Sequence, residues 1–153
     1  MCYSDLNINL GANVAARSIT VQGINRSRKD ITDGLNVSSG SGGVLDAPAC
    51  ASESDITLDT VVTVMPSTKI IQTGSFSSTD DDFTIDSFND VKGDDNIRLD
   101  SGGVLAIATG KSHQRAGGSN KVIVGQNALL KSNRDINLST HADVRQEGRL
   151  TVK

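Results

Sequence analysis

The sequence of this 153-residue chain predicts an all-β protein, and within that class a right-handed parallel β-helix (β-solenoid) with short strands, irregular rungs and protruding loops. Three observations support the prediction. Apolar and polar residues alternate in many short segments, as they do in strands that are buried on one face. The five letters SGGVL occur at residues 41–45 and again at 101–105. The chain has 15 Gly, three Phe, one Tyr and no Trp, a composition that suits a narrow aliphatic core.

The alternating segments are the candidate strands. In each of them a large aliphatic residue returns eight positions after the first apolar residue, and in most an apolar residue returns after fourteen. The segments begin at Leu6, Ile56, Phe83, Ile97, Val122 and Ile136. This spacing predicts a repeating unit of about twenty residues, wound into stacked rungs. We expect the inward-facing residues to form one continuous aliphatic column. Its members would be Leu6, Ile8, Ile56, Leu58, Ile97, Leu99, Ile136 and Leu138.

The two SGGVL segments are expected to be the same corner of the backbone, used twice. Each contains two adjacent glycines, which allow backbone angles that other residues avoid. Each is predicted to be a bend followed by the start of an inward-facing strand. Asp or Asn precedes most of the candidate strands, and these residues favour turns because their side chains bond the nearby backbone.

Other architectures explain the pattern less well. A β-sandwich would also give many short strands, but it does not require the eight-residue relation to persist. Helix is supported only at residues 126–132, as a short turn. Residues 24–34 and the polar, Gly-rich residues 109–120 are predicted to be loops that protrude from the stack. The whole chain, 1–153, is expected to be a single solenoid segment, a fragment of a longer chain with neighbouring rungs.

Charge and composition exclude several classes of function. The formal net charge of −3 is too small to suggest a nucleic-acid partner, and no apolar run is long enough to span a membrane. Two cysteines, Cys2 and Cys50, are too few for a disulfide framework or a zinc site. Catalytic residues are not expected. The only side chains in the sequence that are suited to catalysis are paired carboxylates from an Asp-rich stretch. Those aspartates are Asp82, Asp86, Asp94, Asp95 and Asp100.

Three kinds of side chain are candidates for binding. The run Asp80–Asp82 could hold calcium, although its spacing is not that of a known calcium loop and solvated turn aspartates are the favoured interpretation. We expect no other cofactor. His113 and His141 are interpreted as surface histidines. Basic residues in the two predicted loops are the expected contacts for an anionic partner. They are Arg26, Arg28, Lys29, Lys111 and Arg115.

Three segments resemble the repeats of filamentous-haemagglutinin-type bacterial exoproteins. They are DINLSTHADVRQEGRLTVK at 135–153, DLNINLGANVAARSITVQG at 5–23 and DNIRLDSGGVLAIATG at 95–110. The resemblance implies a very long β-helical protein that is secreted or held at the cell surface. It implies a structural shaft or an adhesive surface facing a host glycan or protein, with no catalytic residues. A β-helical polysaccharide lyase or hydrolase and a phage-fibre-like solenoid remain the alternatives.

Overall fold

The computed structural model describes residues 1–29, 37–74 and 82–153, and every regular element in these ranges is a β-strand. The strands are β1 (Cys2–Leu10), β2 (Val14–Ala16), β3 (Ile19–Lys29), β4 (Val37–Ser41), β5 (Leu45–Asp46), β6 (Ala49–Val64), β7 (Lys69–Gln72), β8 (Phe83–Ser101), β9 (Leu105–Ala106), β10 (Thr109–Val124), β11 (Leu129–Lys131) and β12 (Ile136–Val152). The all-β prediction is therefore confirmed. These ranges hold no helix long and apolar enough to cross a membrane.

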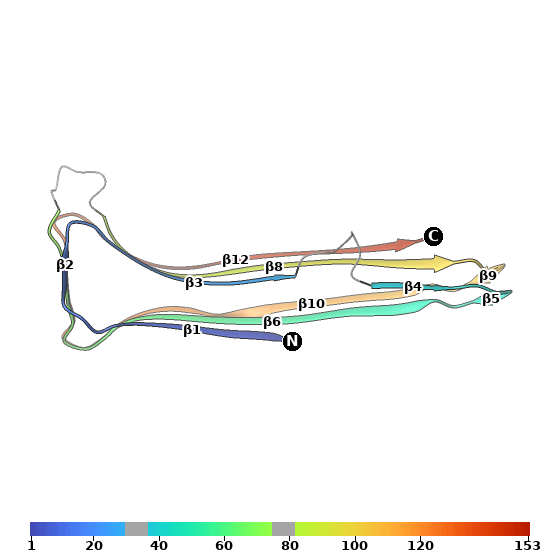
Figure 1. Cartoon of the computed structure of the whole chain (residues 1–153), viewed down its shortest axis with the longest axis horizontal. Helices are drawn as coiled ribbons and strands as arrows, with labels where there is room; N and C mark the ends of the chain where they lie inside the picture. Colours follow the sequence, from blue (N-terminus) through green and yellow to red (C-terminus); the bar gives the residue numbers. More distant parts are fainter. Residues whose placement is uncertain (30–36, 75–81) are drawn as a thin grey trace.

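The strands form parallel sheets built in three layers. One long sheet has the order β1-β6-β10, and the other places β8 between β12 on one side and β3 and β4 on the other. Figure 1 shows these two sheets running side by side along the longest axis, with β2, β7 and β11 crossing between them at one end and β5 and β9 at the other. We call β1–β4 the first layer, β6–β8 the middle layer and β10–β12 the third layer.

The pairing register sets a repeat of about sixty residues. Leu10 pairs with Val64, and Val64 pairs with Val124, so the layers are 54 and 60 residues apart at this point. The predicted unit of about twenty residues is wrong. Steps of eight or fourteen residues are even numbers, and even steps return to the same face of one strand. Phe83, Val91 and Ile97, whose spacings of eight and fourteen residues suggested this unit, all lie in β8.

The two SGGVL segments do form the same corner twice. Ser41 pairs with Ser101 and Leu45 with Leu105, and the backbone nitrogen of Gly102 donates to the carbonyl oxygen of Ser41 at 3.3 Å. The expectation of an inward-facing strand start is wrong, however. Leu45 is 77% exposed and Leu105 is 64% exposed, because the corner turns these side chains away from the space between the sheets.

The corner at the other end also repeats at sixty residues. Ser67 and Asn127 both adopt the left-handed backbone conformation, with φ of 62° and 59°. They stack, since the backbone nitrogen of Ser67 donates to the carbonyl oxygen of Gln126 at 3.0 Å. The short helical turn expected at 126–132 is wrong, because β11 occupies Leu129–Lys131. The buried side chain of Gln72 joins all three layers here, to Arg17 on one side and Ser132 on the other.

Apolar side chains between the two long sheets form two clusters rather than one column. The larger cluster contains Ile19, Val62, Val64, Ile70, Phe83 and Ile85, and the smaller contains Ile56, Leu58 and Val91. Between them lie buried polar residues, of which Thr60 and Asn89 bond each other at 2.6 Å. The predicted single column is also interrupted in the third layer, where Ile136 is 37% exposed and Leu138 is 46% exposed.

The loop predicted at 109–120 is wrong, because those residues belong to β10. The whole of β10 pairs in register with β6, from Thr109 against Ala49 to Val124 against Val64. A polar, Gly-rich sequence forms a strand here because a long neighbour supplies its hydrogen bonds. In the second predicted loop, residues 24–29 belong to β3, and residues 30–34 lie outside the described part of the chain.

Candidate functional site

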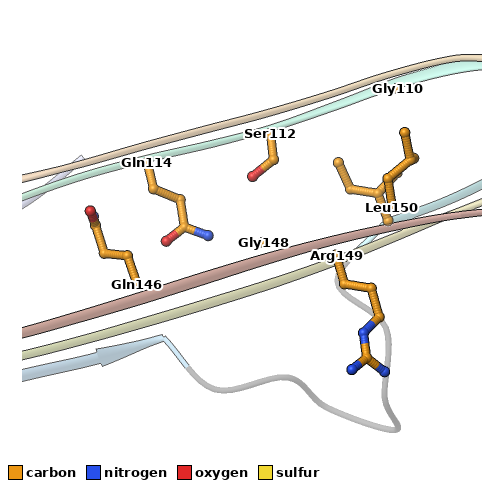
Figure 2. A pocket seen from close by; sticks show the side chains of 8 residues that line it. Gly110, Ser112, Gln114, Gln146, Gly148, Arg149 and Leu150 are labelled. Atoms are coloured by element: carbon orange, nitrogen blue, oxygen red, sulfur yellow. The ribbon is translucent and has the colours of Figure 1, made fainter.

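A pocket of about 400 Å³ lies between the two long sheets in the third layer. It is lined by Ile97 of β8, by Gly110, Ser112 and Gln114 of β10, and by Gln146, Gly148, Arg149 and Leu150 of β12. Figure 2 shows Ser112 and Gln114 pointing from β10 toward β12 and Gln146 pointing back toward β10, while Arg149 points away from the cavity. The wall of the pocket is therefore formed by hydroxyl and amide groups beside the aliphatic side chains of Ile97 and Leu150.

Gln114 is the polar group that spans this pocket. Its Nε2 donates to the carbonyl oxygen of Glu147 at 3.0 Å, which ties β10 to β12. Its Oε1 is buried and accepts no hydrogen bond from the part of the chain that the structure describes. Gly93 of β8 makes room for that oxygen, since a Cβ at this glycine would lie 3.0 Å from it. A buried acceptor without a donor costs free energy, so a ligand that donates to Oε1 would gain affinity from this group.

A buried ion pair lies next to the pocket. Asp95 of β8 points into the space between the sheets, and its side chain is fully buried. Its Oδ1 bonds the Nζ of Lys29 and accepts from the hydroxyl of Ser52 at 2.9 Å. Its Oδ2 accepts from the hydroxyl of Ser112 at 2.6 Å. These contacts connect all three layers, because Lys29, Asp95 and Ser112 come from the first, middle and third layers.

The three donors keep Asp95 ionised. Burial alone would raise the pKa of this carboxyl group, because a charge is less stable away from water. Hydrogen bonds from Lys29, Ser112 and Ser52, together with the positive charge of Lys29, outweigh burial and lower the pKa below its usual value. Asp95 is therefore suited to hold the layers together as an anion, and its oxygens are already engaged by groups of the protein.

A second polar cluster lies on the outer face of the β3-β8-β12 sheet. The Nδ1 of His141 lies 3.2 Å from Oδ1 of Asp86, and the hydroxyl of Ser139 donates to the same oxygen at 2.9 Å. The ring of His141 stacks on Phe88 with 4.2 Å between the ring centroids. A serine hydrolase requires the serine to bond the histidine. Here Ser139 and His141 both contact the Asp86 carboxylate instead, so these side chains connect β12 to β8.

The basic residues predicted to bind an anionic partner do not converge. Arg26 and Arg28 lie on the outer face of β3, 3.4 Å and 3.5 Å from the Asp90 carboxylate. Lys29 points inward to Asp95. Lys111 and Arg115 are exposed on the outer face of β10, in the opposite long sheet (Figure 1). The five residues therefore do not lie on one surface, and their contact with an anionic partner stays a prediction.

The aspartates considered for calcium and for catalysis are also dispersed. Asp82 is exposed, and Asp80 and Asp81 lie outside the described residues. Among the residues that the structure describes, no group of three or more His, Cys, Asp or Glu side chains could hold a metal ion. Asp86 and Asp95 face opposite sides of β8, while Asp94 and Asp100 pair with Lys92 and Arg98. Cys2 and Cys50 are both free thiols.

The ion pair of Lys29 with Asp95 was missed by the sequence reasoning, although a signal was present. Asp95 is two residues before Ile97 and four before Leu99, so strand alternation places all three side chains on the inward face. A single carboxylate on an apolar face requires a cationic partner. The partner could not be found from the sequence, because Lys29 is 66 residues away along the chain.

The arrangement can hold layers together and can offer hydrogen bonds to a small polar ligand in the pocket. Its polar groups are joined mainly to one another and to strands of the neighbouring layer. Comparisons with protein-family models, with curated proteins and with solved structures find no match to this chain.

Proposed function

We propose that this chain is a non-enzymatic structural segment of a right-handed parallel β-solenoid, in which each layer is one turn of about sixty residues. The observation that carries the proposal is the continuous parallel register of the middle layer. Along β6 sixteen residues pair with β10, and along β8 seventeen residues pair with β12. A chain that adds one layer per turn grows in length without changing its cross-section, which is the property that a shaft requires.

The resemblance to filamentous-haemagglutinin-type repeats supports a proposal for the parent protein of this segment and for its location. In that setting the chain is part of a large bacterial protein that is secreted or displayed at the cell surface, and its outer faces are available for adhesion to a glycan or protein. Polar residues line both outer faces. Arg26, Asp90 and Asp143 form one row across β3, β8 and β12, and Glu53 stands beside His113 on the other sheet.

A cross-linking experiment tests the sixty-residue turn. Glu53 of β6 and His113 of β10 are register partners on an outer face. In a Cys2→Ser, Cys50→Ser background, Glu53→Cys with His113→Cys should form a disulfide rapidly, because Cα atoms of paired strands lie about 4.8 Å apart, within disulfide reach. The matched control is Glu53→Cys with Lys121→Cys, which moves the second thiol about 26 Å along the same strand. Equal cross-linking of the two variants would contradict the proposal.

A binding experiment separates a shaft from an adhesive surface. The charge-removing substitutions Lys111→Ala and Arg115→Ala affect exposed side chains on the outer face of β10. For a shaft, the longer protein that carries both changes should adhere to its target cells as strongly as the unaltered protein, with its circular dichroism unchanged. Loss of adhesion with the fold intact would assign the binding surface to this face of the segment.

A further inference from the structure

The corner formed by the two SGGVL segments carries a stripe of exposed aliphatic residues. They are between 64% and 84% exposed, and no other Val, Leu or Ile in the part of the chain that the structure describes is as exposed. We call them the corner stripe: Val44, Leu45, Val104, Leu105 and Ile107. The stripe follows the repeat of the fold, because Leu45 pairs with Leu105, and the backbone nitrogen of Leu105 donates to the carbonyl oxygen of Val44 at 3.1 Å.

The corner stripe faces sideways from the stack of layers. Figure 1 shows β5 and β9 at one tip of the longest axis, beyond the ends of the long strands. A layer stacked above or below would pair with the backbone of a corner, so it would extend the stripe and leave its outward surface open. Exposed aliphatic residues of β12 differ in this respect. Val144 and Val152 pair with buried residues of β8, and a further layer would cover them.

The corner presents no exposed charge. Residues 41–49 and 101–110 contain a single acidic or basic side chain, that of Asp46. Asp46 is 3% exposed, and its Oδ2 accepts from the backbone nitrogen of Gly102 at 3.0 Å. A charged partner would find no opposite charge on the stripe, so the occupant that matches its chemistry is apolar.

The backbone of the corner can leave water at low cost, because many of its polar groups are paired between the two SGGVL corners. Four backbone nitrogens of the second corner donate to carbonyl oxygens of the first at 2.8 to 3.3 Å. The donors are Gly102, Leu105, Ile107 and Thr109. An unpaired backbone group costs free energy in an apolar environment. Pairing removes that cost for these groups when the side chains beside them enter an apolar phase.

The size and position of the corner stripe favour a lipid surface over a protein partner. Five aliphatic side chains at this exposure present on the order of 400 Å² of apolar surface, which is enough to mark an interaction site. A stable protein interface buries about 800 Å² on each partner, against a complementary surface. The stripe supplies about half of that area, and it lies on a projecting tip (Figure 1). A fluid bilayer adapts its surface to such a tip.

We propose that the corner stripe inserts into the surface of a phospholipid bilayer. The aliphatic side chains enter the boundary between the headgroups and the acyl chains, and the long strands remain in water. The contact is an attachment at one edge of the molecule and does not span the membrane. It requires only the two paired corners of this chain, and it adds to the proposed shaft a property that a shaft alone does not need.

Vesicle flotation tests the proposal. The unaltered chain should float with phosphatidylcholine vesicles, and raising the salt from about 0.1 M to about 1 M should not release it, because the stripe is uncharged. Leu45→Ser with Leu105→Ser should lower the partition coefficient at least about tenfold, since two leucines no longer enter the apolar layer. The matched control is Leu138→Ser with Leu150→Ser. It removes two exposed leucines from the edge strand β12, and it should bind as the unaltered chain does.

A tryptophan at the corner gives a second readout that does not depend on the serine variants. The chain contains no tryptophan of its own. The fluorescence of Val104→Trp should shift to shorter wavelength when the vesicles are added, and lipids with brominated acyl chains should quench it. Glu53→Trp, on the outer face of β6, should show neither change. Circular dichroism in the absence of vesicles checks that each variant keeps its strands.

Three results would overturn the proposal: an unaltered chain that does not float, release of the chain by salt, or a tryptophan at position 104 that is not quenched. Equal losses of binding in the two serine pairs would place the contact at the edge of the stack and would also exclude the corner. A chain that does not float but forms a dimer through the stripe would have a second copy as its occupant. The disulfide between positions 53 and 113 tests the turn separately. If it forms in a chain that does not float, the bilayer contact is excluded and the sixty-residue turn stands.

Discussion

At the scale of single residues, one close approach between layers requires a glycine. Gly118 of β10 has a φ of 136°, a value that side chains of L-amino acids rarely adopt. A Cβ at this position would overlap the backbone carbonyl of Leu58 in β6. Its neighbour Gly117 has open space around the same position. Two adjacent glycines with the same chemistry therefore have different structural roles.

Replacing Gly118 should be much more damaging than replacing Gly117. Gly118→Ala forces both an unfavourable φ and a backbone shift against β6, and we expect a loss of about 3 kcal/mol in the free energy of unfolding. Gly117→Ala should change it by less than about 0.5 kcal/mol. Urea unfolding followed by circular dichroism measures both values. Equal losses would mean that β10 does not approach β6 at Leu58.

The buried carboxylate of Asp95 gives a prediction for pH. Its pKa is lowered in the folded state, so its contribution to stability is complete above the unfolded value of about 3.9 and is lost as the pH falls through the folded value. Asp95→Asn should cost about 2 kcal/mol near neutral pH, because Lys29 loses its partner. That cost should shrink as the pH falls below about 4.

The control for Asp95→Asn is Asp94→Asn, which alters the adjacent carboxylate on the outer face of β8, paired with Lys92. Its cost near neutral pH should be below about 1 kcal/mol, as for other surface pairs. Thermal unfolding of both variants at several pH values measures the difference. An Asp95→Asn cost that does not change with pH would contradict an ionised Asp95.

At the scale of elements, position in the stack decides how much a residue contributes. Ile85 in β8 and Leu138 in β12 are register partners and face the same interior. Ile85 is fully buried because layers cover it on both sides, whereas Leu138 is 46% exposed. The alternation in the sequence is the same for both strands. Alternation alone therefore identifies the inward face but not the depth of burial.

Truncation of these two side chains to alanine should cost different amounts of unfolding free energy in the middle layer and at the edge of the stack. Ile85→Ala should cost about 3 kcal/mol of unfolding free energy, since it leaves a cavity in the larger aliphatic cluster. Leu138→Ala should cost less than about 1 kcal/mol in the monomer, because much of its side chain already contacts water. Denaturant unfolding at low protein concentration provides the measurement. A large cost at Leu138 in the monomer would indicate that β12 is covered by another part of the chain.

The strand segments that could be predicted were those with apolar alternation. Residues 6–10, 56–58 and 136–138 lie in strands as expected, although the strands that contain them are longer. Residues 109–120 of β10 were predicted to be a loop because their inward positions are small or polar, including Gly110, Ser112 and Gln114. Their conformation is set by pairing with β6, and local sequence preference does not contain that information.

At the scale of the whole molecule, one sequence feature indicated the register between layers. The SGGVL pair has the correct sixty-residue spacing, while the more numerous eight-residue spacings pointed to a shorter unit. Even spacings accumulate within any long strand, so they carry no information on where the chain turns. The Asp95 site depends on this register. It brings Lys29, Ser52 and Ser112 together from three layers, and so it could not be assembled from the sequence.

Long strands in few layers give the molecule an extended shape. The 19 residues of β8 span about 63 Å at about 3.3 Å per residue, whereas three layers at about 4.8 Å are far thinner. We expect a radius of gyration of about 20 Å in small-angle X-ray scattering, against about 15 Å for a compact domain of this length. A value near 15 Å would exclude the two extended sheets.

The identical corners also bear on how such a chain changes its length over generations. A genetic recombination event between the two coding segments for SGGVL would add or remove the 60 residues that separate them. Because this interval is the spacing of the paired strands, the corner sequence would be preserved at the new junction and the neighbouring pairs would keep their alignment. An added copy would, however, set a second Asp95 beside the first, and like charges directly opposite each other are destabilising. Lengthening by this route would therefore favour descendants in which one of the two aspartates had been replaced by a neutral residue.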